Sequence, residues 1–98
     1  MPEFDWDDNK NRSNQGKHKI SFEDAIDIFN DEDRIHYKSE RNGEQRFKTI
    51  GKAFQAIIVV IYTTRELVVR IISARRARKE ERRAYLTKKL SNQEDDTK

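Results

Sequence analysis

A run of apolar and mostly β-branched side chains, "AIIVVIY" at residues 56–62, constrains the fold of this chain more than any other segment. A strand with one face in water alternates apolar and polar residues, whereas a strand covered on both faces is apolar throughout. The run is also far shorter than the roughly 20 residues of a membrane-spanning helix. It therefore predicts the central strand of a sheet, paired with residues near 44–53 on one side and 67–74 on the other.

The segments on either side of this run complete an antiparallel meander. Asn42-Gly43 is the strongest short hairpin signal that a sequence can carry, and it joins "RIHYK" to "EQRFKTIGKAF". A tight turn near residues 64–66 joins the central strand to "LVVRIISA". We therefore expect four consecutive antiparallel strands.

Helices are expected before and after the meander. A short strand, "EFDWD", comes first, and a polar helix, "DNKNRSNQGKH", follows it with Asp7 or Asp8 as its cap. Ser21 caps the next helix, whose apolar residues recur at i, i+3, i+4 and i+7: Phe22, Ala25, Ile26 and Phe29. Residues 76–90 are rich in helix formers and contain no Gly or Pro, which predicts a terminal helix.

The expected fold class is α+β. It comprises an antiparallel sheet of four to five strands, two N-terminal helices packed on one face, a C-terminal helix, and a second face available to a ligand. Residues 1–90 are expected to form a single domain, because 98 residues are too few for two cores. The last segment, "SNQEDDTK" at 91–98, is predicted to be a flexible acidic tail.

Composition limits the chemistry that the chain can support. It has no cysteine and only 2 histidines, which argues against a disulfide framework and against a zinc site, and no metal or other cofactor is expected. The N-terminal segment is acidic and polar, unlike a secretory signal. These features predict a cytoplasmic protein that does not engage a membrane.

Basic side chains are concentrated in residues 34–90, whereas acidic ones dominate residues 1–33. Arg46, Lys48 and Lys52 share one face of their strand, because residues two apart point the same way. On the last strand Arg70 shares a face with Val68 and Ile72. Helical spacing is expected to gather a further basic group into one stripe: Arg75, Arg78, Lys79 and Arg82. Such surfaces attract phosphates or acidic partners, although a solvated helix face has the same pattern.

Three separated motifs stand out: "FDWDDNKNRSNQGKHKISFEDAIDIF", "NGEQRFKTIGKA" and "RIISARRARKEERRAY". In this order they resemble the BrnT family of type II toxins, over Phe4 to about Tyr85. The resemblance implies a RelE-like fold and a ribonuclease that cleaves RNA to inhibit translation and growth. It also implies a cognate BrnA-like ribbon-helix-helix antitoxin that neutralises the toxin and binds operator DNA with it. The family pattern reads Lys-His-Gly where this chain has Lys17-His18-Lys19.

Cleavage of RNA without a metal needs a base for the 2′-OH proton, cations for the charge of the phosphorane, and an acid for the leaving 5′ oxygen. The candidate cations are Arg46, Lys48 and Arg70, and the candidate proton carriers are Glu44, His18 and Tyr62. The other basic candidates are assigned to RNA binding: Lys52, Arg75, Arg76, Arg78, Lys79 and Arg82. For His18, a contact with the C-terminal dipole of its helix is an alternative role. Trp6 and Phe47 fall on apolar faces, so core packing is expected for them rather than base stacking.

Two other functions fit the same residues. The cationic face can bind nucleic acid without cutting it, as an inactivated toxin or a co-repressor. The basic terminal helix can instead dock an acidic segment of the antitoxin. The crowding of guanidinium groups at residues 70–78 predicts a surface shared by RNA and antitoxin, because Glu80 and Glu81 are too few to neutralise it.

Overall fold

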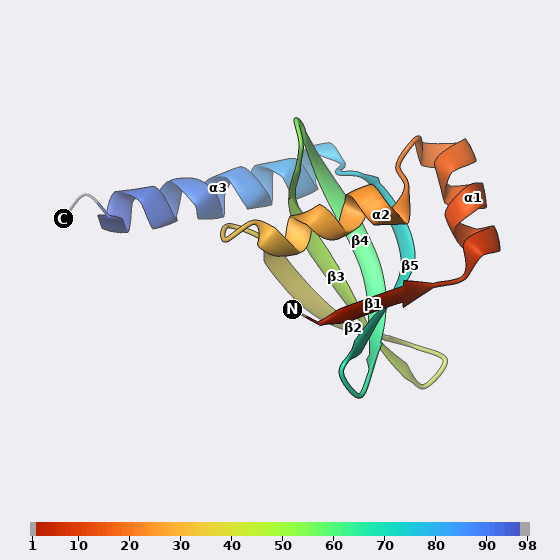
Figure 1. Ribbon diagram of the computed structural model, residues 1–98. Coiled ribbons are helices and arrows are strands. Elements are labelled where there is room, and N and C mark those ends of the chain that lie inside the picture. The colour runs from red at the N-terminus through yellow and green to blue at the C-terminus, as the bar shows by residue number, and fades with distance from the viewer. Residues whose placement is uncertain (1, 97–98) are drawn as a thin grey trace.

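The computed structural model describes residues 2–96, and within them five strands form one sheet with helices on both of its faces (Figure 1). In chain order the elements are β1 (Glu3–Trp6), α1 (Asp8–His18), α2 (Phe22–Ala25), the 3-10 helix η1 (Ile26–Asn30), β2 (Ile35–Arg41), β3 (Glu44–Ala53), β4 (Ala56–Arg65), β5 (Val68–Arg76) and α3 (Lys79–Asp96). The predicted α+β class is confirmed.

Strand β4 lies at the centre of the sheet, whose order is β1-β5-β4-β3-β2. It pairs antiparallel with β3 on one side and with β5 on the other. Ile58, Val59 and Val60 are buried, because each face of the strand is covered by side chains from a helix. The prediction for residues 56–62 is confirmed, including the identity of both neighbouring strands.

The first strand makes the sheet mixed, because β1 pairs in parallel with β5. The antiparallel meander predicted from the sequence holds for β2 through β5 only. Alternation in "EFDWD" identifies a strand but carries no information about its partner or direction. As expected, the aromatic side chains of this strand pack inward: Phe4 lies 5.2 Å from Phe29 and Trp6 lies 6.1 Å from Phe22, between ring centroids.

The hairpin between β2 and β3 turns at Asn42-Gly43, as predicted. Both residues have positive φ, 54° and 79°, which is the conformation of a type I′ turn. The turn sets the register of the two strands, so that Tyr37 lies opposite Lys48 and Ser39 lies opposite Arg46.

Side chains on the two faces of the sheet form separate cores. On one face Phe22, Ala25 and Ile28 of α2 and η1 pack against the strands. On the other face Tyr85 of α3 packs with Ile50 and Val59. Helix α3 starts over this second face and then runs past the edge of the sheet (Figure 1). The second face is therefore available to a ligand only in the part that α3 leaves uncovered, which we call the open face.

Helix α1 has no apolar stripe, and two buried asparagines hold it in place instead. The Asn14 amide nitrogen donates to the carbonyls of Ile20 and Ala74 at 2.9 and 2.8 Å, and its oxygen accepts the N–H of Ala74 at 3.1 Å. The Asn11 oxygen accepts the N–H of Phe22 at 2.9 Å. These bonds place α1 beside β5, at the edge of the sheet beyond the end of β1 (Figure 1).

Both ends of the C-terminal helix differ from the prediction. Strand β5 continues to Arg76 and α3 begins at Lys79, so Arg75 is in the strand and the predicted helical stripe that included it is wrong. The helix also continues to Asp96, into the segment 91–98 that was predicted as a tail, because no Gly or Pro interrupts it. Residues 97 and 98 lie outside the described residues. In the part of the chain that is described, no helix combines the length and apolar composition needed to cross a membrane.

Candidate functional site

Basic side chains from two strands meet on the open face of the sheet. Arg46 and Lys48 point to the same side as Ile50, which packs beneath α3. Arg75 of β5 lies opposite Val59, on that same side. The shared face predicted for Arg46 and Lys48 is therefore present, and Arg75 joins them there from the far side of β4.

A β-bulge in β5 brings Arg70 to this face as well. Ile61 pairs with Ser73 and Tyr62 pairs with Ile71, so Ile72 has no partner on β4. Arg70 and Arg75 are five residues apart, and in a regular strand an odd separation puts two side chains on opposite faces. The extra residue of the bulge shifts the alternation by one, so both side chains lie on the same face. Arg70 forms an ion pair with Asp5, its neighbour on β1, which is the role that a half-exposed arginine commonly takes.

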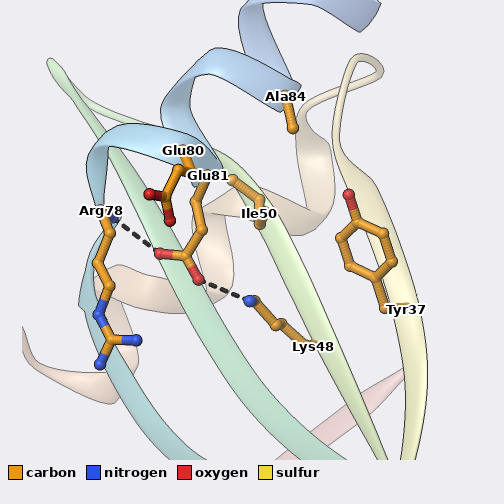
Figure 2. A pocket seen from close by; sticks show the side chains of 7 residues that line it. All are labelled: Tyr37, Lys48, Ile50, Arg78, Glu80, Glu81 and Ala84. Atoms are coloured by element: carbon orange, nitrogen blue, oxygen red, sulfur yellow. Dashed lines mark hydrogen bonds and ion pairs between the residues drawn. The ribbon is translucent and has the colours of Figure 1, made fainter.

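One carboxylate organises the centre of the open face. Glu81 receives a bidentate pair from Arg75, at 2.8 and 2.9 Å, and an ion pair from Lys48 Nζ at 2.6 Å. It also accepts the backbone N–H of Arg78 at 2.8 Å, as a residue at the third position of a helix does in a capping box (Figure 2). Glu81 thus ties the start of α3 to β3 and β5. Sequence reasoning missed this role, although the position of Glu81 in the first turn of a helix was a usable signal.

The hydrogen bonds from Arg75, reinforced by Lys48 and the Arg78 N–H, hold the pKa of the Glu81 carboxyl far below its ordinary value, although burial opposes the shift. Glu81 is therefore a fixed anion at neutral pH and a poor proton acceptor. Its chemical contribution is to fix the positions of two cations. Each keeps N–H groups free for another acceptor, since a guanidinium has five donors and an ammonium has three.

A hollow of about 440 Å³ opens beside this carboxylate, between α3 and the strands (Figure 2). Its lining combines one aromatic ring, charged groups and two apolar side chains: Tyr37, Lys48, Ile50, Arg78, Glu80, Glu81 and Ala84. Tyr37 is half-exposed, and Lys48 Nζ lies 6.0 Å from the centroid of its ring. An aromatic face beside a cation suits a nucleobase next to its phosphate.

A second hollow of about 500 Å³ lies farther along the open face, lined by Ser39, Glu40, Arg41, Arg46, Ile61, Ile72 and Ser73. Arg46 pairs with Glu44 across 3.2 Å on its own strand. A partly exposed pair of this kind contributes little and is readily exchanged for another anion. The Arg46 guanidinium is therefore available to a phosphate in this hollow.

The comparison with known protein families finds one described as the ribonuclease toxin, BrnT, of type II toxin-antitoxin systems, which matches residues 6–81. The chain belongs to this family. The resemblance seen in the sequence is thereby confirmed, and with it the function of a ribonuclease toxin whose partner is an antitoxin. The matched region ends at Glu81 and leaves most of α3 outside. It contains four basic residues of the open face, which we call the cation cluster: Arg46, Lys48, Arg70 and Arg75. A comparison with curated proteins finds no match.

Tyr62, a predicted proton carrier, lies on the opposite face of this BrnT sheet. Its ring is stacked on Phe47 at 5.3 Å and meets Phe29 edge-on at 5.3 Å, and its hydroxyl is hydrogen-bonded to Thr49 at 3.3 Å. The structure thus separates Tyr62 from the cations. Phe47 packs on the same inner face, as expected for a core residue.

The other predicted residues lie at the borders of the open face. His18 ends α1 and lines a hollow next to β5. Lys52 is exposed near the far end of β3, where its backbone N–H is bonded to Asp31 at 2.8 Å. The remaining basic residues are exposed where β5 passes into α3: Arg76, Arg78, Lys79 and Arg82.

Asp31 holds α3 over the sheet. Its carboxylate accepts the Tyr85 hydroxyl at 2.6 Å and the Lys52 N–H at 2.8 Å. Burial acts to raise the pKa of Asp31, but these hydrogen bonds outweigh it and hold the pKa below its ordinary value. Burial and the bond to Asp31 raise the pKa of Tyr85. The first turns of α3, including Glu81, are thereby fixed relative to the BrnT cation cluster.

Proposed function

We propose that this BrnT chain is an active endoribonuclease and that it holds the reacting phosphate of RNA on the open face, around Lys48, Arg75 and Arg46. The observation that carries the proposal is the convergence of these three cations on one uncovered face of a chain from a ribonuclease family. RNA is the substrate class that such a face suits, because cations track its phosphates and hydroxyls contact its ribose.

The reaction needs no group beyond those of the RNA and the protein. The 2′ oxygen attacks the adjacent phosphorus, a new O–P bond forms, and the bond from phosphorus to the 5′ oxygen breaks. Negative charge accumulates on the phosphorane oxygens, where Lys48 and Arg75 stabilise it without reorganising, since Glu81 already fixes them. Glu44 and His18 are the predicted proton carriers that lie on or beside this face, whereas Tyr62 packs against the core on the opposite face.

Cleavage of single-stranded RNA by the purified protein, in the presence of a chelator, tests the proposal. Arg46→Ala and Lys48→Ala should each lower the rate by roughly 10² to 10³, the usual effect of one well-placed donor. Lys38→Ala is the matched control, since Lys38 is an exposed lysine on the neighbouring strand. Wild-type protein that binds RNA without cutting it would show a non-catalytic binding module instead.

We further propose that the antitoxin is a BrnA-like ribbon-helix-helix protein, which forms an operator-binding complex with this toxin in the cytoplasm. The exposed basic residues around the start of α3, including Arg78 and Lys79, support this proposal, because they fit an acidic segment of a partner. Co-purification with the product of the adjacent gene, operator binding by the pair and cell fractionation test its three parts.

A further inference from the structure

Two hollows meet at the bulge of β5. The hollow that contains Arg41 and Arg46 is bounded at one end by Ile72 and Ser73. A smaller hollow of about 200 Å³ on the other side of β5 is bounded by the same two residues and by α1: Lys10, Ser13, Asn14, Lys17 and His18. Because the two share Ile72 and Ser73, they are adjacent, and we call them together the depression, which extends from β2 to α1.

The lining residues of α1 form a single stripe, because they are spaced at i, i+3, i+4, i+7 and i+8. Asn14 sets the rotation of this stripe, since its amide makes two hydrogen bonds with the backbone of Ala74. Lys10 and Lys17, about one turn before and after Asn14, are therefore held beside β5. Among the described side chains, no carboxylate forms an ion pair with either lysine, whereas Lys48, Arg70 and Arg75 each have one.

The depression has the chemistry of a track for single-stranded RNA. Cations stand at both ends, the side chains of Ile61 and Ile72 form an apolar floor, and Ser39 and Ser73 supply hydroxyls that can contact a ribose. From β2 to β5 it crosses three interstrand spacings of ~4.8 Å, or roughly 14 Å, before it reaches α1. This length exceeds what one nucleotide can span.

We propose that RNA bound on the open face continues across the β5 bulge onto α1, where Lys10 and Lys17 hold phosphates that flank the site of cleavage. This inference rests on the proposed function and extends it. Lys10 and Lys17 act in binding and not in chemistry, so their loss weakens the hold on RNA that is long enough to reach α1 and spares RNA that is too short.

The test compares Lys10→Gln/Lys17→Gln with Arg12→Gln/Lys19→Gln. Both double variants remove two positive charges from α1 or the residue that follows it, but Arg12 and Lys19 do not line the depression. Affinity is measured over a salt series with a single-stranded RNA that is long enough to reach α1 from the open face and is made uncleavable by 2′-O-methyl groups. The first variant should lower the salt slope by about 1.4, the value for two phosphate contacts on a single strand, and the control should not. Dinucleotide cleavage should be unchanged in both variants.

Equal salt slopes for the two variants would contradict the proposal that RNA extends onto α1, even if the protein cleaves RNA. A lower salt slope for the first variant alone, in a protein that does not cleave RNA, would support the proposed RNA track and contradict the proposed ribonuclease function. Failure of the wild-type protein to bind single-stranded RNA would contradict both the RNA track and the proposed function. Thermal unfolding of the two variants checks that neither loses affinity through a loss of structure.

Discussion

At the scale of single residues, Glu81 decides how the cation cluster is built. Glu80 and Glu81 together look too few to neutralise the guanidinium groups between residues 70 and 78. The structure shows that Glu81 alone pairs with Arg75 and Lys48, which come from different strands. A side chain that is 11 % exposed can do so because it is enclosed between its partners. Repulsion between the cations is thereby offset, and their geometry is fixed in the free protein.

Glu81→Gln should lower the free energy of unfolding by about 1.5 to 3 kcal/mol at pH 7, the range for hydrogen bonds to a charged group. Because the pKa of Glu81 is lower in the folded than in the unfolded chain, its contribution is present above the ordinary value of 4.5. The contribution is lost as the pH falls below that value towards the lowered pKa. The variant should therefore lose less stability than the wild type between pH 5 and pH 3.

Thermal midpoints measured over this pH range check the prediction, with Glu80→Gln as the control because Glu80 is the exposed neighbour of Glu81. Parallel curves for wild type and Glu81→Gln would contradict it. RNA cleavage by Glu81→Gln should fall at neutral pH as well, because Lys48 and Arg75 lose the group that positions them.

At the scale of elements, α1 shows how a helix without an apolar stripe can be held firmly. Buried Asn14 satisfies the N–H and the carbonyl of Ala74 at a point where β1 has ended and no other strand of the described residues pairs with this edge of β5. The side chain therefore takes the place of a neighbouring strand. This contact also aims the lysines of α1 at the depression beside β5.

Asn14→Ala should lower the free energy of unfolding by about 2 to 4 kcal/mol, since it leaves two buried backbone groups of Ala74 without partners. Hydrogen exchange at the Ala74 amide should accelerate first, because the loss is local to the contact between α1 and β5. Chemical denaturation checks the magnitude, and Ser13→Ala, an exposed change on the same helix, is the control. Equal stabilities for the two variants would show that Asn14 is not the anchor.

At the scale of the whole molecule, basic groups lie on two connected surfaces: the open face, and the start of α3 at its border. The first suits RNA, and the second is placed where an acidic antitoxin segment would also cover the RNA site. Arg78 lines the hollow beside Glu81, so a partner bound at Arg78 would lie at the edge of this hollow (Figure 2). If the proposed RNA site is correct, such a partner would neutralise the toxin by occupying the substrate site.

Arg78→Glu/Lys79→Glu should weaken RNA cleavage and antitoxin binding together, each by tenfold or more, because both partners are anionic there. Stability should change little, since acidic residues are favourable in the first turn of a helix. Lys88→Glu/Lys89→Glu makes the same charge change farther along α3 and should affect both activities less. Cleavage assays and antitoxin titrations check this, and intact antitoxin affinity with lost cleavage would show that the two partners use different faces.

Local patterns in the sequence determined most of the fold. The apolar run at residues 56–62 placed the central strand, Asn42-Gly43 placed the hairpin, and Ser21 placed a helix start, where its hydroxyl accepts the Asp24 N–H at 3.1 Å. Each of these signals acts through residues that are close in the chain, so it can be recognised without knowing which distant residues pack against it. The family motifs could be recognised for the same reason, because they are contiguous segments.

Only the tertiary structure decided which side chains meet at the site. Strand periodicity shows which residues of one strand share a face, but not which faces of different strands coincide, so Tyr62 was grouped with cations that lie on the other side of the sheet. The bulge at Ile72 reversed the relation between Arg70 and Arg75, and packing of Tyr85 against Asp31 helped to bring Glu81 between Lys48 and Arg75. These outcomes depend on contacts between residues far apart in the chain, and no local pattern encodes such contacts.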